Sequence, residues 1–210
     1  MALSKLLSRS FPRLSRIWSP EDNTKHTIPV EILRGTVENL VDPKIQETGL
    51  PNVAIAQAYS GIANIVETAF EMNANAPGRE NDGPTMLVRG LRDMAVVIEN
   101  TLDPNQENIT FETNALFELG RSLFHLDGAR KNLIRFKSNR ENDPDFIEFP
   151  TKLQSLTPSQ RTSQAERLDT FARQVQQHLI PHLPNTKIYT AAENHEHSGG
   201  PVHREHGWDL

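Results

Sequence analysis

The sequence predicts an all-α protein: a single bundle-like domain of five or six helices with flexible N- and C-terminal tails. Two observations lead to this class. Apolar residues recur every three or four positions through most of the chain, and polar segments rich in proline separate these runs. Its 210 residues are enough for one hydrophobic core. We therefore divide the chain into a signal-like segment at 1–26, a helical domain at 27–184 and a histidine-containing tail at 185–210.

The first twenty residues are basic and amphipathic. Four of them are basic and none is acidic, while Leu3, Leu7 and Phe11 follow one helical stripe and Trp18 ends the segment. Such a segment is typical of a bacterial export signal, a mitochondrial presequence or a membrane-surface anchor at 1–18, and also of an ordinary first helix docked on the body. We take Leu3, Leu7, Phe11 and Trp18 as candidate interaction residues.

Charge and composition exclude several functions. Without the four bases at its start, the chain carries 18 basic against 27 acidic side chains, a net charge of −9. This balance disfavours nucleic acid as a partner, because a binding surface must neutralise phosphates. The absence of cysteine excludes disulfides, thiolate zinc sites and a cysteine nucleophile. No apolar run is long enough to span a bilayer as a helix.

The first helices follow from periodicity and turn residues. Thr27 and Pro29 predict the start of a helix that ends before Asp42, with Val30, Leu33, Val37 and Leu40 on one side. The strongest pattern predicts a central helix over 52–73, in which Gly61 would let a neighbouring helix approach closely. The proline- and glycine-rich stretch 77–84 predicts an exposed loop.

Two more helices are predicted over 85–102 and 113–126, the second ending at Asp127 and Gly128 because glycine readily adopts the left-handed conformation that closes helices. Residues 129–137 fit either a short helix or a strand. Alternating apolar residues at 132–136 and 145–149 would suit a small β-hairpin, so a hairpin near 132–149 remains an alternative.

The last helix has the clearest start signal. Thr157 supplies a capping hydroxyl, Pro158 occupies the first helical position and Gln160 completes a capping box. A narrow apolar seam that includes Leu168 and Val175 then follows at helical spacing. Such a seam packs within the molecule or recognises a partner helix, so we take Leu168 and Val175 as further candidate interaction residues.

Four of the eight histidines lie in the tail, namely His195, His197, His203 and His206. Neutral imidazoles bind divalent transition metals, and His195 and His197 would lie on one side of an extended chain. Ordering a polar tail around a metal ion would cost conformational entropy, which opposes binding. The alternative is that the histidines are incidental and that the tail binds no cofactor. These four residues are the candidate metal ligands.

Other chemistry-bearing residues have structural explanations as well. His178 and His182 are four residues apart, but Pro181 interrupts the helix, and a cation is favoured at a helix C-terminus without any metal. His125 lies in an apolar run and fits a core or boundary position. The loop carboxylates Glu80, Asp82, Glu141, Asp143 and Asp145 could pair for acid–base work only if they were buried.

The common catalytic motifs are missing: the chain has no P-loop, dinucleotide-binding glycine motif, His-Glu-x-x-His or nucleophile elbow. We therefore expect a non-enzymatic helical module that binds another protein, as an exported bacterial effector or accessory protein. A cytoplasmic location remains open. The alternatives are a mitochondrial matrix protein with a cleaved presequence, and a hydrolase or metal-dependent enzyme that uses histidine and loop carboxylates.

Overall fold

The computed structural model describes residues 25–47, 50–79, 82–101, 103, 106–136 and 152–183, and it confirms the all-α class. The described elements are β1 (Lys25–Pro29), α2 (Val30–Val37), η1 (Glu38–Leu40), α3 (Pro43–Glu47), α4 (Asn52–Ala69), α5 (Gly83–Glu99), β2 (Asn108–Glu112), α6 (Thr113–Ser122), α7 (His125–Arg135), α8 (Pro158–Gln174), η3 (Val175–Leu179) and η4 (Ile180–His182). β1 begins two residues before the helical domain predicted to start at 27. The predicted tails lie outside the described residues, except for residues 25 and 26 of the N-terminal segment, which belong to β1.

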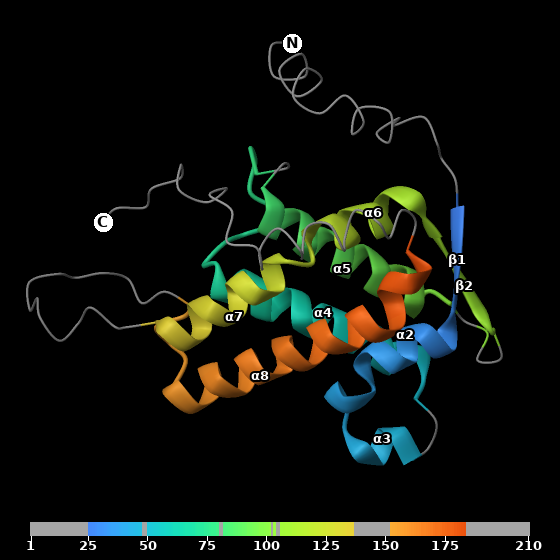
Figure 1. Ribbon diagram of the computed structural model, residues 1–210, viewed down its shortest axis with the longest axis horizontal. Coiled ribbons are helices and arrows are strands. Elements are labelled where there is room, and N and C mark those ends of the chain that lie inside the picture. Colours follow the sequence, from blue (N-terminus) through green and yellow to red (C-terminus); the bar gives the residue numbers. More distant parts are fainter. Residues whose placement is uncertain are drawn as a thin grey trace, which may run out of the picture.

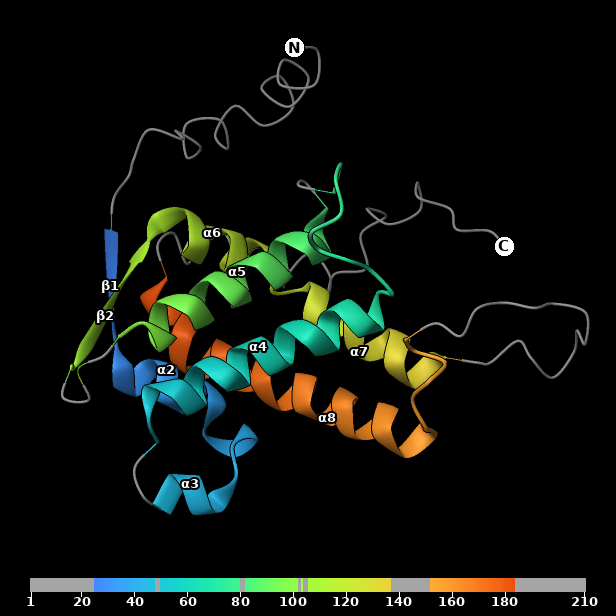
Figure 2. The same ribbon diagram turned by 180° about the vertical axis from the view of Figure 1, so that it is seen from behind.

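The long helices lie side by side around α4, as both ribbon views show (Figures 1 and 2). α5 packs along one side of α4 and carries α6 on its far side, whereas α7 and α8 pack against each other and cover the opposite side of α4. α2 and the two-stranded sheet lie at one end of this arrangement (Figure 1). Every long helix therefore contributes one apolar face to a shared core.

Helix α4 is the most buried element. Most of its apolar side chains are almost completely shielded from water, with Ile55, Tyr59, Ile62, Ala63 and Val66 at 0% exposure, whereas Val53 in the first turn is 47% exposed. Only a helix that is apolar around most of its circumference can be covered on several sides at once. The prediction of a central helix at 52–73 is confirmed, although the α-helix ends at Ala69 and a turn follows.

The hydroxyl of Tyr59 ties α2 and α4 together inside the core. It lies 2.8 Å from the Thr36 hydroxyl, which in turn donates to the Leu33 carbonyl at 2.7 Å. Burial raises the pKa of the Tyr59 hydroxyl well above its usual range, and the hydrogen bond with Thr36 only partly offsets this. The Tyr59 ring also packs nearly perpendicular to the Phe171 ring of α8, with ring centroids 5.5 Å apart. Three elements thus meet at one tyrosine.

The α8 capping box predicted at Thr157 is confirmed. The Gln160 backbone N–H donates to the Thr157 hydroxyl at 3.2 Å, and the Thr157 N–H donates to the Gln160 side chain at 2.8 Å. The helix continues into the π-helical turn η3, and its seam faces the core: Leu168 and Val175 are 0% and 1% exposed. The seam therefore packs within the molecule, where a partner could not reach these two side chains.

The strands of the small sheet come from distant parts of the chain. β1 pairs antiparallel with β2, with Ile28 opposite Ile109, and both side chains are buried against the helices. On the other face the hydroxyls of Thr27 and Thr110 lie 3.2 Å apart. Thr27 therefore belongs to a strand, and the prediction that it opens a helix is wrong; α2 begins at Val30.

The hairpin alternative near 132–149 is not supported at its first strand, because α7 runs through 132–135; the second stretch, 145–149, lies outside the described residues. The predicted helix end at Asp127 and Gly128 is also wrong, since both lie inside α7. Gly128 faces the Phe70 ring, where a Cβ atom would come within 3.2 Å of it. A glycine at position 128 therefore leaves room for the Phe70 ring and does not mark a turn of the chain.

The close helix crossing occurs at Gly90 and not at Gly61. A Cβ atom on Gly90 of α5 would lie 2.9 Å from the Leu119 backbone nitrogen of α6, whereas one on Gly61 would meet nothing within 4 Å. The expectation that Gly61 marks a close approach is therefore wrong. The packing of α5 against α6 requires a glycine at position 90, one helix after Gly61.

These two glycines predict opposite effects of the same substitution. We expect Gly90→Ala to lower the free energy of unfolding by about 1–3 kcal/mol, because α5 and α6 must move apart. Gly61→Ala should raise it by about 0.5–1 kcal/mol, because alanine is the better helix former and has room. Chemical denaturation of both variants measures this, and a Gly90→Ala variant as stable as the parent would contradict the close crossing.

Candidate functional site

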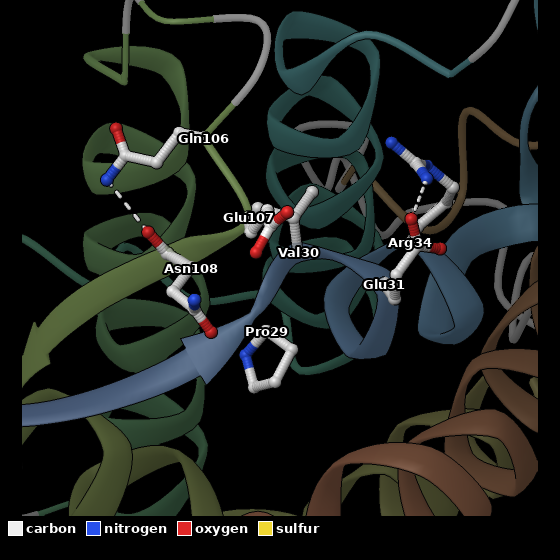
Figure 3. Close-up of a pocket in the computed structure, with 7 residues that line it drawn as sticks. All are labelled: Pro29, Val30, Glu31, Arg34, Gln106, Glu107 and Asn108. Carbon is white, nitrogen blue, oxygen red and sulfur yellow. Dashed lines mark hydrogen bonds and ion pairs between the residues drawn. The ribbon is translucent and has the colours of Figure 1, made fainter.

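A polar recess lies where the sheet meets the helices. It forms between the end of β1, the first turn of α2 and the segment that leads into β2, and its volume is about 400 Å³ (Figure 3). Its lining residues are Pro29, Val30, Glu31, Arg34, Gln106, Glu107 and Asn108. We call this feature the recess.

Backbone geometry holds the recess in shape. The Val30 N–H belongs to the first turn of α2, where helical N–H groups have no partner within the helix, and it donates to the Glu107 carbonyl at 2.9 Å. The Gln106 side-chain amide donates to the Asn108 carbonyl at 2.8 Å. The first bond joins two segments that lie far apart in the sequence, whereas the second lies within the segment that leads into β2. The recess therefore depends on the β1–β2 pairing, which brings the two segments together.

The recess carries charges of both signs. Glu31 lies in the first turn of α2, where a negative charge is favoured, and its carboxylate pairs with Arg34 Nη1 at 2.6 Å. The Arg34 Nε is buried without a hydrogen-bond partner. The exposed Glu107 carboxylate takes part in no ion pair among the described residues. The recess can therefore offer hydrogen bonds and charge to an incoming polar surface.

A second feature is two carboxyls with raised pKa values, that of the exposed Asp93 on α5 and that of the half-buried Glu118 on α6. Crowding by protein raises the pKa of Asp93, with a smaller effect of the Glu112 charge in the same direction. The same desolvation, and then the charge of Asp93, raises the pKa of Glu118. Arg89 lowers both values in part. These are carboxyls that helices bring together, unlike the loop carboxylates considered from the sequence.

Glu67 of α4 shows the opposite behaviour. Burial alone would raise its pKa, but hydrogen bonds from the Ala74 N–H and from Arg92, together with the charges of Arg92 and Lys152, lower it below its usual value. The Glu67 Oε1 accepts from the Ala74 N–H at 2.9 Å, and Oε2 lies 2.6 Å from Arg92 Nη2. This pair ties α4 to α5 and fixes the turn after α4, where Glu71 adopts a positive φ of 49°.

The terminal candidates cannot be placed. His195, His197, His203 and His206, and likewise Leu3, Leu7, Phe11 and Trp18, lie outside the described residues, as do the loop carboxylates Glu80, Glu141, Asp143 and Asp145. Asp82 is described and is exposed at the start of α5. Within the described ranges, no group of three or more histidine or acidic side chains is arranged to hold a metal ion.

Two internal histidines, His125 and His178, are packed against other parts of the molecule. The His125 ring lies next to the Phe124 ring, with centroids 3.9 Å apart and the two planes tilted by 38°, and it is nearly perpendicular to the Phe70 ring at 6.3 Å. His178 lies half-buried in the π-helical turn, with its ring against Gly35 of α2. His182 is exposed in the turn that follows. The structure therefore does not bring His178 and His182 to one helical face.

Sequence reasoning missed the recess, and only one signal could have revealed part of it. The segment Asn108–Glu112 alternates polar and apolar residues, which is the pattern of a half-buried strand. The partner strand β1 carries no comparable alternation. The pairing that builds the recess could therefore not be inferred from either segment alone.

Comparison of the chain with models of known protein families, with curated proteins and with solved structures found no match. None of the helices within the described ranges has the length and apolar character needed to cross a bilayer.

The Glu67 network predicts a pH-dependent contribution to stability. Because its folded pKa lies below the usual 4.5, this contribution is complete above that value and is lost as pH falls through the folded pKa. We expect Glu67→Gln to lower the free energy of unfolding at pH 7 by about 1–3 kcal/mol and to flatten its acid dependence. Denaturation from pH 7 to pH 3 tests this, with the exposed Glu166→Gln of α8 as control. Equal acid dependence in parent and Glu67→Gln would refute the assignment.

Proposed function

We propose that the protein is a non-enzymatic helical protein-interaction module and that the recess contacts its partner. The observation that supports this is the character of the recess. It is open, and most of its lining side chains are charged or carry an amide. Small-molecule sites are mostly apolar and enclose their ligand, whereas the margins of protein interfaces are polar and exposed.

The chemistry of the lining also favours binding over catalysis. The seven residues offer carboxylates, amides and one guanidinium group, and include no histidine, serine, threonine, tyrosine or lysine. Covalent catalysis needs an activated nucleophile, and histidine is the commonest acid–base group. The paired Glu31 and Arg34 are better suited to orient a polar surface than to transfer a proton.

An exported bacterial effector or accessory protein is the setting that we propose for this module. Support comes from the basic, amphipathic first 26 residues and from the absence of cysteine, which lets a chain refold after transport without wrong disulfides. A mitochondrial presequence is the competing explanation of the same segment. N-terminal sequencing of the isolated protein separates the two, since a mature start near residue 20 would favour the presequence.

Site-directed crosslinking tests the interaction. We expect a photoreactive residue at Glu107 to give a saturable crosslink to one protein in the native host, because its exposed side chain lines the recess. The control position is Ser163, an exposed residue of α8. Helix α8 begins at the end of the molecule away from the two-stranded sheet (Figures 1 and 2). Excess unlabelled parent protein should abolish the crosslink, and an excess of a Glu31→Lys, Arg34→Glu variant should not.

Two results would contradict the proposal. One is the same crosslinked protein from positions 107 and 163, and the other is an absence of any competed crosslink at position 107. A chain lacking residues 1–25 tests the setting separately. If its location is unchanged and residues 1–25 do not redirect a reporter, the export proposal fails while the recess proposal stands.

A further inference from the structure

Within the described residues the sheet has two strands, so each strand leaves one edge without a neighbouring strand. β2 packs against α5 and α6, and the Gln106 side chain already donates to its Asn108 carbonyl at 2.8 Å. β1 packs mainly against β2 and α2 and lies at one end of the molecule in both ribbon views (Figures 1 and 2). The free edge of β1 is therefore the more open of the two.

The hydrogen-bonding groups on this edge follow from the β1–β2 ladder. The Val30 N–H donates to the Glu107 carbonyl at 2.9 Å, and along an antiparallel strand every second residue is directed at its neighbour in this way. Ile28 therefore directs its backbone groups to β2, whereas Lys25 and Thr27 direct theirs away from it. Within the described ranges, neither of these two N–H groups donates to a group outside the ladder. A short row of unpaired N–H and C=O groups thus faces outward.

We propose that the free edge of β1 binds an extended segment of another protein, which joins the sheet as a third strand antiparallel to β1. An added strand supplies donors and acceptors at the spacing of this row. Its side chains on the helix side lie beside the buried Ile28, and those on the outer side lie beside the exposed Lys25 and Thr27. The segment therefore alternates apolar and polar residues and carries an acidic residue opposite Lys25.

A second copy of the chain fits this edge less well. Pairing around a two-fold axis at Thr27 would place Lys25 opposite Pro29, which has no N–H to donate. The neighbouring register would bring the Lys25 side chains of both copies diagonally across from each other on one face, where like charges repel. An edge of five residues also buries far less than the roughly 1,200 Å² of a stable interface between two proteins.

A peptide with the sequence of residues 106–113 is the probe for this edge. It alternates polar and apolar residues, and the register that β2 itself adopts would pair Thr110 with Thr27 and place Glu112 opposite Lys25. In the full-length parent protein we expect the Lys25 and Thr27 amides to exchange fast. Peptide at about 2 mM should slow their exchange about threefold, as a dissociation constant near 1 mM gives. NMR-detected hydrogen exchange measures this, and the same peptide with Thr110→Pro, which lacks the central donor, is the control.

Thr27→Pro tests the edge from the side of the protein. The substitution removes an N–H that faces away from β2, so the protein should stay folded while the effect of the peptide is lost. His26→Pro is the matched control: it removes an N–H directed at β2 and should lower the midpoint of chemical denaturation. A second measurement uses the parent protein alone. Strand addition slows exchange at Lys25 and Thr27, whereas a peptide that replaced β2 would leave both amides unpaired.

Three results would overturn the proposal. Lys25 and Thr27 amides that are protected in the free protein would show that another part of the chain covers the edge. Self-association that Thr27→Pro abolishes would show that a second copy covers it. Equal effects of the two peptides, or no effect of either, would exclude strand addition. None of these results bears on the crosslink at position 107, which tests the recess separately.

Discussion

The structure depends on burying α4 on several sides at once. An 18-residue helix with so many fully buried apolar side chains cannot remain in water, and its cover must come from several helices because none alone shields more than one face. α5, α7, α8 and α2 supply that cover. The sheet and α6 are arranged around this core, and the recess exists because β1 and α2 close one end of it.

Burying α4 also requires that its polar groups find partners. Tyr59 is satisfied by Thr36, and Glu67 by the Ala74 N–H and Arg92. A buried polar group without a partner costs about 1–3 kcal/mol, so these bonds specify which helices lie next to α4 and in what register. Apolar contacts alone would not determine which helix covers α4, because other helices also have an apolar face. The polar contacts do determine it, because Tyr59 finds its partner on α2 and Glu67 finds Arg92 on α5.

The sequence predicted the elements whose signals are local. The capping box at Thr157 and the periodicity of residues 52–69 depend on residues within a few turns of one another, and both were confirmed. Signals that depend on a distant partner failed. Gly128 is of the residue type that commonly ends a helix, but it lies inside α7 and makes room for the Phe70 ring. Thr27 is of the type that commonly caps a helix, but it lies in β1 opposite Thr110. No local pattern distinguishes these cases.

The candidate sites show the same limit. The recess joins residues 29–34 to residues 106–108, and the close crossing of α5 and α6 depends on Gly90. From the sequence, carboxylates in polar loops were candidates for acid–base work only on the condition that they were buried. The sequence could not show that Asp93 of α5 and Glu118 of α6 have raised pKa values. Burial of a charge is a property of tertiary packing, and sequence periodicity gives only which side of a helix faces inward.

Native-state hydrogen exchange of the full-length protein tests the central role of α4 most directly. If α4 is the shared core, its amides exchange slowest, and their opening free energy equals the global free energy of unfolding. α6, which covers only the outer side of α5, should open at lower free energy. Amides of α4 that exchange before those of α6 or α8 would contradict the account.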